Sequence, residues 1–331
     1  MSLRSLSIGG ATYDLFLSMN PEIEKSISDH KKIIFDLGKK VPIEKIVESC
    51  GGGASNTSVG LSRLGMQAAF CGIIGADQWG EKLLKNMQDE GVNTKPATII
   101  ENETSSFSMI LLLSSGERTI LYNSGANEHL QDATFDSDFV SDTDLVYLNH
   151  LCERSCMIED DLIAALKKKK QIFLAWNPGG SKLDNGIESE HTKELLAHTS
   201  FFVVNKEEAL RFTGGSDIQG AMAKLRTTGA VNICITDGPN GSFASNADGC
   251  WFCPPLAGVR VLDATGAGDA FGTAAAWALV TGQTLPNALI AGTLNASSVV
   301  ETMGAQKGLL SYTEIQLQLR TKPLVTTPLD W

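Results

Sequence analysis

The amino-acid sequence predicts an α/β fold: a three-layer sandwich in which helices cover both faces of a mostly parallel central sheet. Short apolar runs alternate with amphipathic stretches along most of the chain, as strands and helices alternate in such proteins. The 331 residues are enough to bury about 75% of the unfolded chain's surface. With 43% hydrophobic and 20% charged residues, the composition is that of a soluble globular protein.

Six apolar runs are predicted as strands, at residues 3–8, 68–74, 145–148, 172–176, 201–204 and 231–236. Seven amphipathic or apolar stretches are predicted as helices, at residues 56–64, 80–90, 158–169, 206–212, 218–228, 267–281 and 286–302. Asp77 and Asp217 stand where their side chains can cap a helix start, and Gly91 and Gly229 stand where helices end. We expect the tail after Thr321, which contains two prolines, to be irregular.

Two segments depart from this alternation and predict a small separate β-layer. Residues 11–50 follow the first strand without a helix that returns the chain to the sheet. Residues 98–123 alternate polar and apolar positions around the turn Ser-Ser-Gly-Glu at 114–117, which indicates a hairpin. Open α/β sheets bind ligands at the carboxyl ends of their strands, so a β-layer there would be a lid. We therefore expect one domain, residues 1–331, with lid insertions at about residues 11–50 and 98–123.

Charge and cysteine content exclude several classes of protein. A formal net charge of −11 disfavours nucleic acid as a partner, because a phosphate backbone needs a basic face. The seven cysteines are scattered and odd in number, which indicates reduced thiols in the cytoplasm. No signal peptide is recognisable, and no apolar stretch approaches the ~18–20 residues of a membrane span. We expect a cytoplasmic protein that does not bind membranes, with a homodimer formed through an unpaired lid edge.

The most informative stretch is D-A-T-G-A-G-D-A-F at residues 263–271, a glycine-rich turn that leads into a long apolar helix. The first amides of a helix lack intrahelical partners and carry about half a positive charge, so such a turn binds anions. Gly266 and Gly268 would let a phosphate approach the backbone closely. Asp269 cannot bind that phosphate, but it can accept a proton from an attacking alcohol, whereas its alternative role is to complement the helix dipole. The combination predicts phosphoryl transfer to a hydroxyl group.

Competing nucleotide motifs are absent. The glycine-rich run at residues 51–57 contains no lysine and so does not match G-x-x-x-x-G-K-[ST]. The pattern G-x-G-x-x-G fails after Gly266, because its sixth position is Phe271. A dinucleotide-dependent oxidoreductase is therefore disfavoured.

Two long motifs carry a resemblance to a known family. Residues 263–271 closely resemble the C-terminal signature of the ribokinase-like (PfkB) carbohydrate kinases, and G-G-G-A-S-N-T-S-V-G-L-S-R-L-G at 51–65 resembles their N-terminal signature. Five shorter motifs follow in the family's order: G-A-D-Q-W-G at 75–80, G-E-R-T at 116–119, G-A-N at 125–127, N-K-E-E at 205–208 and T-D-G-P-N-G at 236–241. The resemblance spans nearly the whole chain and implies a ribokinase-like fold and an ATP-dependent kinase.

The resemblance implies roles for residues on the phosphate side. Asp269 would be the catalytic base, and the amides of Gly266, Ala267 and Gly268 would form the anion hole. Asn205 and Glu208 match the family's N-x-x-E motif, which organises Mg²⁺ and its waters; the alternative for these two residues is a capped helix with surface acids. The further nucleotide contacts that the resemblance implies are Asn177, Thr236, Gly238, Gly241 and Asn295.

Acceptor and cation sites are implied in the same way. The acceptor-binding residues would be Asp14, Gly51, Gly52 and Asn56, since a carboxylate can accept hydrogen bonds from two vicinal hydroxyls. The alternative for the glycines is a flexible turn before a helix capped by Ser55. Some members of the family bind K⁺ through carbonyl groups beside the anion hole. The matching positions are Asp263, Thr265, Val299, Thr302 and Gly304.

The sequence thus predicts a kinase that transfers the γ-phosphoryl group of ATP, with Mg²⁺ and possible K⁺, to a hydroxyl of a sugar: a pentose, a hexose or a related polyol. Gly53 stands where ribokinases proper carry lysine, which disfavours ribose. The alternative acceptor is a nucleoside such as adenosine, whose base could stack on Phe16, Phe107 or Tyr122 in the lid segments. A more distant alternative, a non-catalytic metabolite sensor, would have no use for Asp269.

Overall fold

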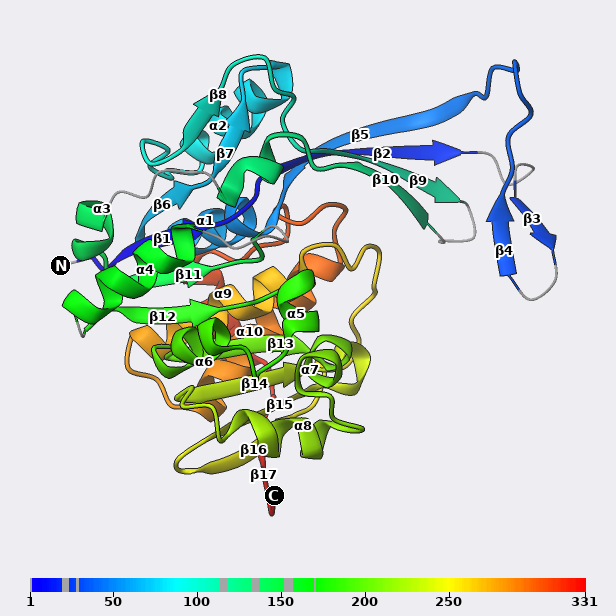
Figure 1. Ribbon diagram of the computed structural model, residues 1–331. Coiled ribbons are helices and arrows are strands. Elements are labelled where there is room, and N and C mark those ends of the chain that lie inside the picture. Colours follow the sequence, from blue (N-terminus) through cyan, green and yellow to red (C-terminus); the bar gives the residue numbers. More distant parts are fainter. Residues whose placement is uncertain are drawn as a thin grey trace.

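A nine-stranded sheet forms the centre of the computed structural model, which describes residues 2–19, 24–27, 30–113, 118–131, 137–151, 157–169 and 171–331 (Figure 1). The strand order is β17-β16-β15-β14-β13-β12-β11-β1-β6. The parallel strands are β1 (Arg4–Ile8), β6 (Gln67–Cys71), β11 (Leu145–Leu148), β12 (Phe173–Trp176), β13 (Phe201–Asn205) and β14 (Asn232–Thr236). At one edge β15 (Ser242–Asn246), β16 (Gly249–Cys253) and β17 (Thr327–Leu329) continue it antiparallel.

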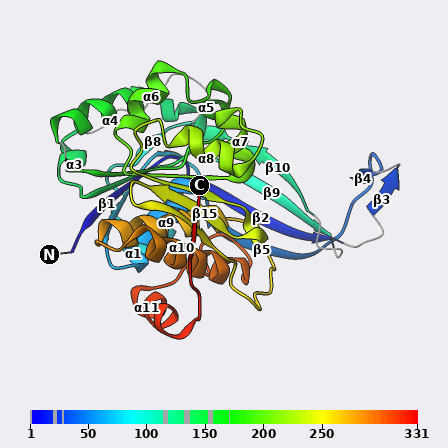
Figure 2. The same ribbon diagram turned by 90° about the horizontal axis from the view of Figure 1, so that it is seen from below.

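Helices cover both faces of this sheet, as predicted (Figure 2). On one face lie α1 (Gly53–Arg63), α9 (Ala267–Val280), α10 (Leu285–Val300) and α11 (Tyr312–Thr321). On the other lie α3 (Ser137–Ser141), α4 (Met157–Lys168), α5 (Ser181–Asn185), α6 (Glu190–Ala197), α7 (Lys206–Thr213) and α8 (Ile218–Leu225). Alternate strand residues feed two separate cores: Tyr147 and Val203 pack on the α9 side, and Val146 and Phe202 on the other.

The predicted helix ends are confirmed where their caps can be checked. Asp77 accepts a hydrogen bond from the Gly80 amide at 2.8 Å at the start of α2 (Gln78–Asp89), and Asp217 accepts one from Gly220 at 2.7 Å. The prediction of an irregular tail was wrong, because β17 pairs with β16. Pro328 is compatible with a strand there, since β17 is the outermost strand of the sheet and an edge strand tolerates a missing amide.

A second sheet projects away from the central one and is called the projecting sheet below (Figure 1). Its order is β10-β9-β2-β5, built from β2 (Thr12–Met19), β5 (Ile43–Gly51), β9 (Phe107–Leu113) and β10 (Arg118–Asn123). The predicted hairpin is confirmed by the antiparallel pairing of β9 with β10, although its turn at 114–117 lies outside the described residues. The described residues also form two short two-stranded sheets. One pairs β3 (Glu24–Ile27) with β4 (His30–Ile33), and the other pairs β7 (Ile73–Gly75) with β8 (Thr98–Ile100).

Membrane-spanning helices are not found in the described part of the chain, where no helix combines the length and apolar character needed to cross a bilayer. The most apolar helices, α9 and α10, are instead packed inside the protein: α9 contacts α1, α10 and β13. Their burial explains why both read as continuous apolar runs without a polar face.

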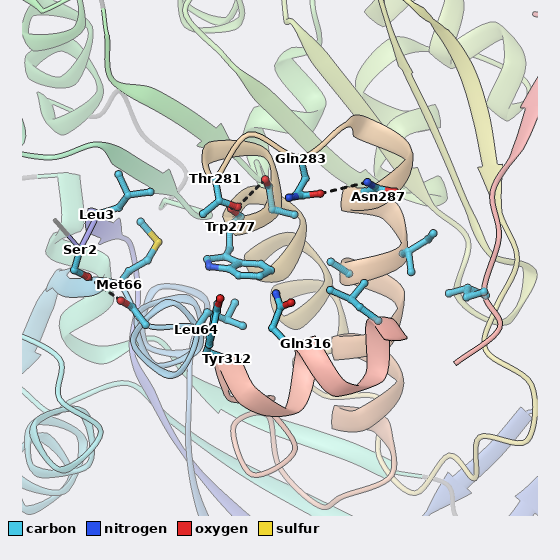
Figure 3. A pocket seen from close by; sticks show the side chains of 16 residues that line it. Ser2, Leu3, Leu64, Met66, Trp277, Thr281, Gln283, Asn287, Tyr312 and Gln316 are labelled. Atoms are coloured by element: carbon cyan, nitrogen blue, oxygen red, sulfur yellow. Dashed lines mark hydrogen bonds between the residues drawn. The ribbon is translucent and has the colours of Figure 1, made fainter. Parts of the chain in front are cut away.

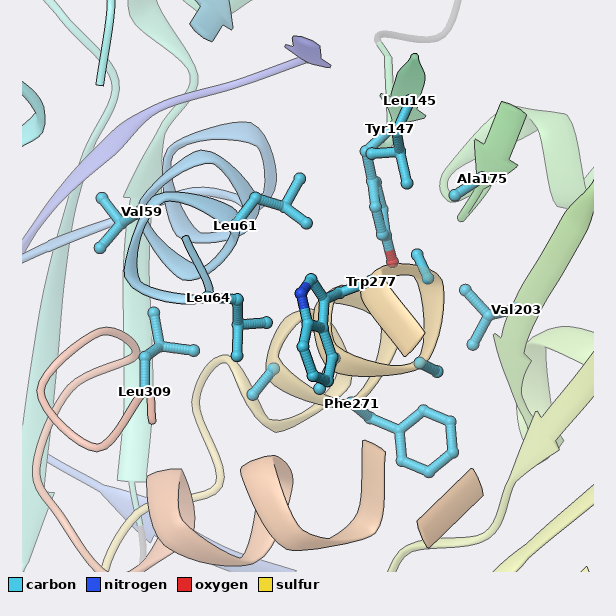
Figure 4. Close-up of a cluster of buried hydrophobic side chains, with 14 of the residues drawn as sticks. Val59, Leu61, Leu64, Leu145, Tyr147, Ala175, Val203, Phe271, Trp277 and Leu309 are labelled. Atoms are coloured by element: carbon cyan, nitrogen blue, oxygen red, sulfur yellow. The ribbon is translucent and has the colours of Figure 1, made fainter. Parts of the chain in front are cut away.

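The packing of α9 against the sheet depends on a missing side chain at Gly272. The hydroxyl of Tyr147 points at this helix (Figure 4), and a Cβ atom at Gly272 would overlap with that oxygen. Tyr147 is fully buried, and its hydroxyl finds no hydrogen-bond partner among the described residues. A buried hydroxyl without a partner costs about 1–3 kcal/mol, so this contact does not gain its stability from hydrogen bonding.

We predict that Gly272→Ala lowers the free energy of unfolding by about 1–3 kcal/mol, although alanine is the better helix former, because the methyl group overpacks the core. Tyr147→Phe should be neutral or stabilising, since it deletes an unpaired polar atom. The double variant should lose less stability than the sum of its parts. Denaturant titrations measure all three, and a Gly272→Ala protein as stable as the wild type would contradict this packing.

Candidate functional site

The two long sequence motifs meet at the carboxyl ends of the parallel strands. The first motif contains the last residue of β5 and all of α1, and the last motif forms the start of α9. A hydrogen bond of 2.7 Å from Asn56 Nδ2 to Asp269 Oδ2 joins the first turns of these two helices. Residues 213 positions apart in the sequence therefore share one site.

The turn before α9 has the backbone of an anion site. Gly266 adopts left-handed φ of 75° and is the N-cap of α9, and a Cβ atom there would collide with Ala305. Both constraints require glycine. At Gly268 a Cβ atom would meet nothing within 4 Å, so the space on the side-chain position of this glycine is open. The amide of Ala267 donates to the Ala264 carbonyl oxygen at 3.3 Å, a weak bond that an anion would have to share or replace.

Asp269 lies in the first turn of α9 and is partly buried. Burial raises the pKa of Asp269 to about 6; the hydrogen bond from Asn56 lowers this pKa and the charge of Glu208 raises it. The carboxylate is thus ionised at neutral pH and far more basic than an exposed aspartate. These are the properties of a group that takes a proton from an alcohol.

Asn56 is held in one orientation by a chain of side-chain amides. Its Oδ1 accepts from Gln306 Nε2 at 3.1 Å, and Gln306 Nε2 also donates to Ser55 Oγ at 2.9 Å. Asn86 Nδ2 donates to Gln306 Oε1 at 2.7 Å. Because Gln306 is a donor here, the oxygen of Asn56 faces it and the amino group of Asn56 faces Asp269. Gln306 was not predicted as a site residue, although it ends the M-G-A-Q run that follows α10.

The predicted acceptor residues lie together beside this pair. Asp14 is 5% exposed on β2, and a Cβ atom at Gly51 would touch its carboxylate. Burial raises the pKa of Asp14 to about 6; a hydrogen bond with Ser108 lowers this pKa and the charge of Asp263 raises it. Gly52, with φ of 90°, is the N-cap of α1. The alternative in which Ser55 caps this helix is therefore wrong.

Cross-strand register shows which face of the projecting sheet carries the aromatic residues that were predicted to stack on a nucleobase. Asp14, Ser108 and Tyr122 are register partners and therefore share one face of the projecting sheet. Phe107 instead stacks on Trp79 of α2 with ring centroids 6.0 Å apart, and its register partner Tyr13 stacks on the same ring at 4.9 Å. Phe107 thus lies on the opposite face, which corrects the prediction for this residue.

Of the other two aromatic residues, only Tyr122 is free to meet a ligand. Phe16 is 1% exposed, and its register partner on β9 is the buried Ile110. Tyr122 is 60% exposed on the face of Asp14, where its hydroxyl accepts from Ser106 at 3.4 Å.

On the phosphate side, Asn205 and Glu208 form a capping box at the start of α7. The Asn205 side chain accepts from the Glu208 amide, and Glu208 accepts from the Asn205 amide, both at 2.9 Å. The capped-helix alternative is therefore realised. It does not remove Glu208 from the site, because its charge raises the pKa of Asp269 and burial raises the pKa of Glu208 itself.

The remaining nucleotide residues separate into two groups. Asn177 follows β12, Thr236 ends β14, and Gly238 and Gly241 flank the next turn, all at the carboxyl edge of the sheet. Asn295 is fully buried in α10, where its Nδ2 donates to the Ala270 carbonyl at 2.8 Å and its Oδ1 accepts from the Leu310 amide at 2.9 Å. Asn295 is thus a structural bridge, and its prediction as a nucleotide contact was wrong.

Two of the predicted cation positions, Thr265 and Gly304, contact the buried carboxylate of Asp263. Its Oδ1 accepts from the amide and the hydroxyl of Thr265 at 3.0 and 2.7 Å, and its Oδ2 accepts from the Gly304 amide at 3.0 Å. The carbonyl of Val299 accepts from both the amide and the hydroxyl of Thr302. No cluster of three or more His, Cys, Asp or Glu side chains suited to a metal ion occurs within the described residues.

A separate cavity of about 840 Å³ lies between the end of α1 and helices α9, α10 and α11 (Figure 3). Trp277 and Tyr312 line it, with their rings edge to face at 6.0 Å between centroids. None of the predicted site residues lines this cavity. Trp277 lies more than two helical turns beyond Asp269 on α9, so this cavity is distinct from the site.

Comparison with known proteins assigns the family. The profile of the pfkB family of carbohydrate kinases matches residues 28–311. The chain belongs to this family. It is therefore a kinase, a phosphotransferase that acts on an alcohol group. Among its relatives, an uncharacterised sugar kinase of Archaeoglobus fulgidus is 27% identical over 253 residues, which are 76% of this chain and 98% of that protein. The ribokinase of Haemophilus influenzae is 26% identical over 270 residues, 78% and 83% of the two chains.

Solved structures share the fold. Arabidopsis thaliana ribokinase, in complex with ribose and ATP, has a TM-score of 0.81 at 22% identity over 97% of this chain and 100% of that one. A nucleoside kinase of Burkholderia thailandensis, in complex with inosine, has a TM-score of 0.76 at 19% identity over 96% and 98% of the two chains. These likenesses confirm the predicted ribokinase-like fold.

We predict that Asn56→Leu raises the pKa of Asp269 above about 6, because the hydrogen bond that favours the charged carboxylate is lost. Titration of the ¹³C-labelled aspartate carboxyl groups by NMR measures this pKa directly. Asn287→Leu, which alters an exposed asparagine near the start of α10, is the control and should leave it unchanged. A pKa that stays the same in Asn56→Leu would contradict the role of this hydrogen bond.

Proposed function

We propose that this protein transfers the γ-phosphoryl group of ATP to a hydroxyl of a sugar or related polyol, with Asp269 as the catalytic base. The observation that carries the proposal is the first turn of α9. There a carboxylate with a pKa near 6 follows directly after Gly268, where a Cβ atom would meet no neighbour, at a helix N-terminus. A base next to main-chain donors suits transfer of a phosphoryl group to an alcohol.

The proposed reaction follows from this arrangement. Asp14 accepts hydrogen bonds from acceptor hydroxyls and orients one of them toward Asp269. Asp269 takes the proton of that hydroxyl as its oxygen forms a bond to the γ-phosphorus. The bond from the γ-phosphorus to the bridging oxygen breaks, and ADP leaves with that electron pair. The amides of Gly266, Ala267 and Gly268 donate to the transferring group and offset its charge.

Mg²⁺ fits the acidic side of this site. When bound with the nucleotide, it neutralises phosphate charge, and it retains most of its water. Glu208 is partly buried and lies within electrostatic reach of Asp269. We propose that Asn205 and Glu208 hold the water shell of the ion. For the nucleotide itself we propose Asn177, Thr236, Gly238 and Gly241 as contacts.

The projecting sheet is proposed to act as a lid over the acceptor. Asp14 lies on this sheet, so closing it brings the acceptor to Asp269. Its edge strand β10 exposes Ile120 and Leu121, which supports a homodimer formed by a second copy at this edge. We place the enzyme in the cytoplasm, consistent with the free thiols of Cys50, Cys71, Cys234, Cys250 and Cys253.

A nucleoside is the second candidate acceptor, and Tyr122 favours it. Its ring is 60% exposed on the face that carries Asp14. It could therefore stack on a nucleobase whose ribose binds the carboxylate. Release of ADP from ATP, measured with a panel of pentoses, hexoses, sugar acids and nucleosides, decides between the two. No ADP release above background with any acceptor would refute the proposed function.

We predict that Asp269→Asn lowers kcat by about 10²–10⁴-fold while the affinity for ATP stays nearly unchanged, because only proton removal is lost. The control is Asp217→Asn, the same substitution at a helix N-cap where asparagine is an equally good cap. Steady-state rates and calorimetric ATP titrations measure the two effects. An Asp269→Asn enzyme within a few-fold of wild-type kcat would show that another group is the base.

Activity should be lost on acidification near neutral rather than near pH 4. The pKa values of Asp269 and Asp14 are both raised to about 6, so both carboxylates become protonated as the pH falls through that value. We expect kcat/KM to be constant above about pH 7 and to fall at least tenfold per pH unit below about pH 6. A profile that stays flat to about pH 5 would contradict the raised pKa values.

A further inference from the structure

The carboxylate of Asp263 holds together the two segments that shape the glycine-rich turn at residues 266–268, called the anion turn below. Only 3% of this side chain is exposed. One of its oxygens binds Thr265, the residue before Gly266, and the other binds the amide of Gly304. Gly304 precedes Ala305, the residue against which Gly266 packs. The position of the turn thus depends on a buried negative charge.

A buried carboxylate needs a positive partner, because its hydration is lost and hydrogen bonds alone do not replace it. Arg118 is that partner. Its Nη1 lies 2.6 Å from Asp263 Oδ1 and 3.4 Å from the hydroxyl of Thr265. Arg118 is the first residue of β10, so the positive charge comes from the projecting sheet and crosses to the loop before α9.

The one charged side chain among the residues that the family resemblance assigns to K⁺ is already engaged by protein donors. Asp263 is the only charged member of that set, and both of its oxygens already accept hydrogen bonds from protein donors, one of them from the guanidinium of Arg118. The Val299 carbonyl is likewise engaged by Thr302. A cation at this carboxylate would have to compete with a permanently charged arginine.

We propose that Arg118 is a positioning residue that supplies, from the projecting sheet, the positive charge that a monovalent cation supplies beside the anion hole in other members of the family. The proposal rests on the proposed phosphoryl transfer in one respect: it assumes that the anion turn binds the phosphate. It has two consequences. The enzyme needs no K⁺, and the sheet that carries Asp14 is tied by one ion pair to the loop that binds phosphate.

The first test compares salts on the wild-type protein. Initial rates and melting temperatures are measured in KCl, NaCl and choline chloride at equal ionic strength. We expect both quantities to be the same in the three salts. A higher rate or a higher melting temperature in KCl alone would overturn the proposal, because it would demonstrate a K⁺ site that Arg118 does not occupy.

The second test removes the guanidinium. Arg118→Met should lower kcat about 10–100-fold, as expected for loss of a charge-assisted contact that preorganises the site. Lys45→Met, which deletes an exposed positive charge from β5 of the same sheet, is the matched control and should keep wild-type kcat. In Arg118→Met the uncovered carboxylate should accept K⁺, so KCl should raise its melting temperature and rate relative to choline chloride. Wild-type kcat in Arg118→Met, or a melting temperature independent of salt, would contradict the proposal.

Arg118→Lys is a second variant that keeps the proposal testable if Arg118→Met does not fold. It keeps the charge but loses the forked geometry, so we expect an intermediate kcat without K⁺ activation. If it shows K⁺ activation equal to that of Arg118→Met, charge at this position is not what matters. Wild-type protein that releases no ADP with any acceptor would refute the proposed function, and the salt dependence of the melting temperatures would still decide the role of Arg118.

Discussion

The hydrogen bond between Asn56 and Asp269 is the contact on which the rest of the site depends. It joins the first turns of α1 and α9, two helices that begin at the same edge of the central sheet. Gln306 donates to the side-chain oxygen of Asn56, so the amino group of Asn56 faces the carboxylate of Asp269. The result is a base with a defined orientation, placed where helix amides lack partners. Neither helix alone would create that combination.

Several carboxylates gather at this edge of the protein. Carboxylates here affect one another in two pairs, since Asp263 raises the pKa of Asp14 and Glu208 raises the pKa of Asp269. Such crowding of carboxylates would repel a nucleotide if nothing opposed it. The amides at the start of α9 and the guanidinium of Arg118 supply the opposing charge. Mg²⁺ brought with the nucleotide would add to it.

Much of the fold could be predicted because its signals are local. The caps at Asp77 and Asp217 and the apolar runs of β11 and β13 are visible in a few consecutive residues. The start of α9 was predicted for the same reason: glycine, glycine and aspartate occur within five positions. The strand at 327–329 was missed because its stability comes from pairing with β16 rather than from its own residues.

Parts of the site could not be predicted because they depend on long-range packing. Asn295 fits a ligand contact as well as a buried bridge until α9 and the Leu310 amide are placed around it. Phe107 and Tyr122 are both lid aromatics in the sequence, and only the register of β9 with β2 and β10 separates their faces. Gln306 and Arg118 act on residues more than a hundred positions away, so the motifs that contain them do not reveal which residues they contact.

The role of Asp269 as the base is tested most directly by a crystal structure with the acceptor, ADP and aluminium fluoride. We expect the planar aluminium fluoride to lie against the amides of residues 266–268, with the acceptor oxygen about 2.6–3.2 Å from the Asp269 carboxylate. A fluoride bound away from that turn, or an acceptor hydroxyl that approaches it without contacting Asp269, would contradict the assignment of the base.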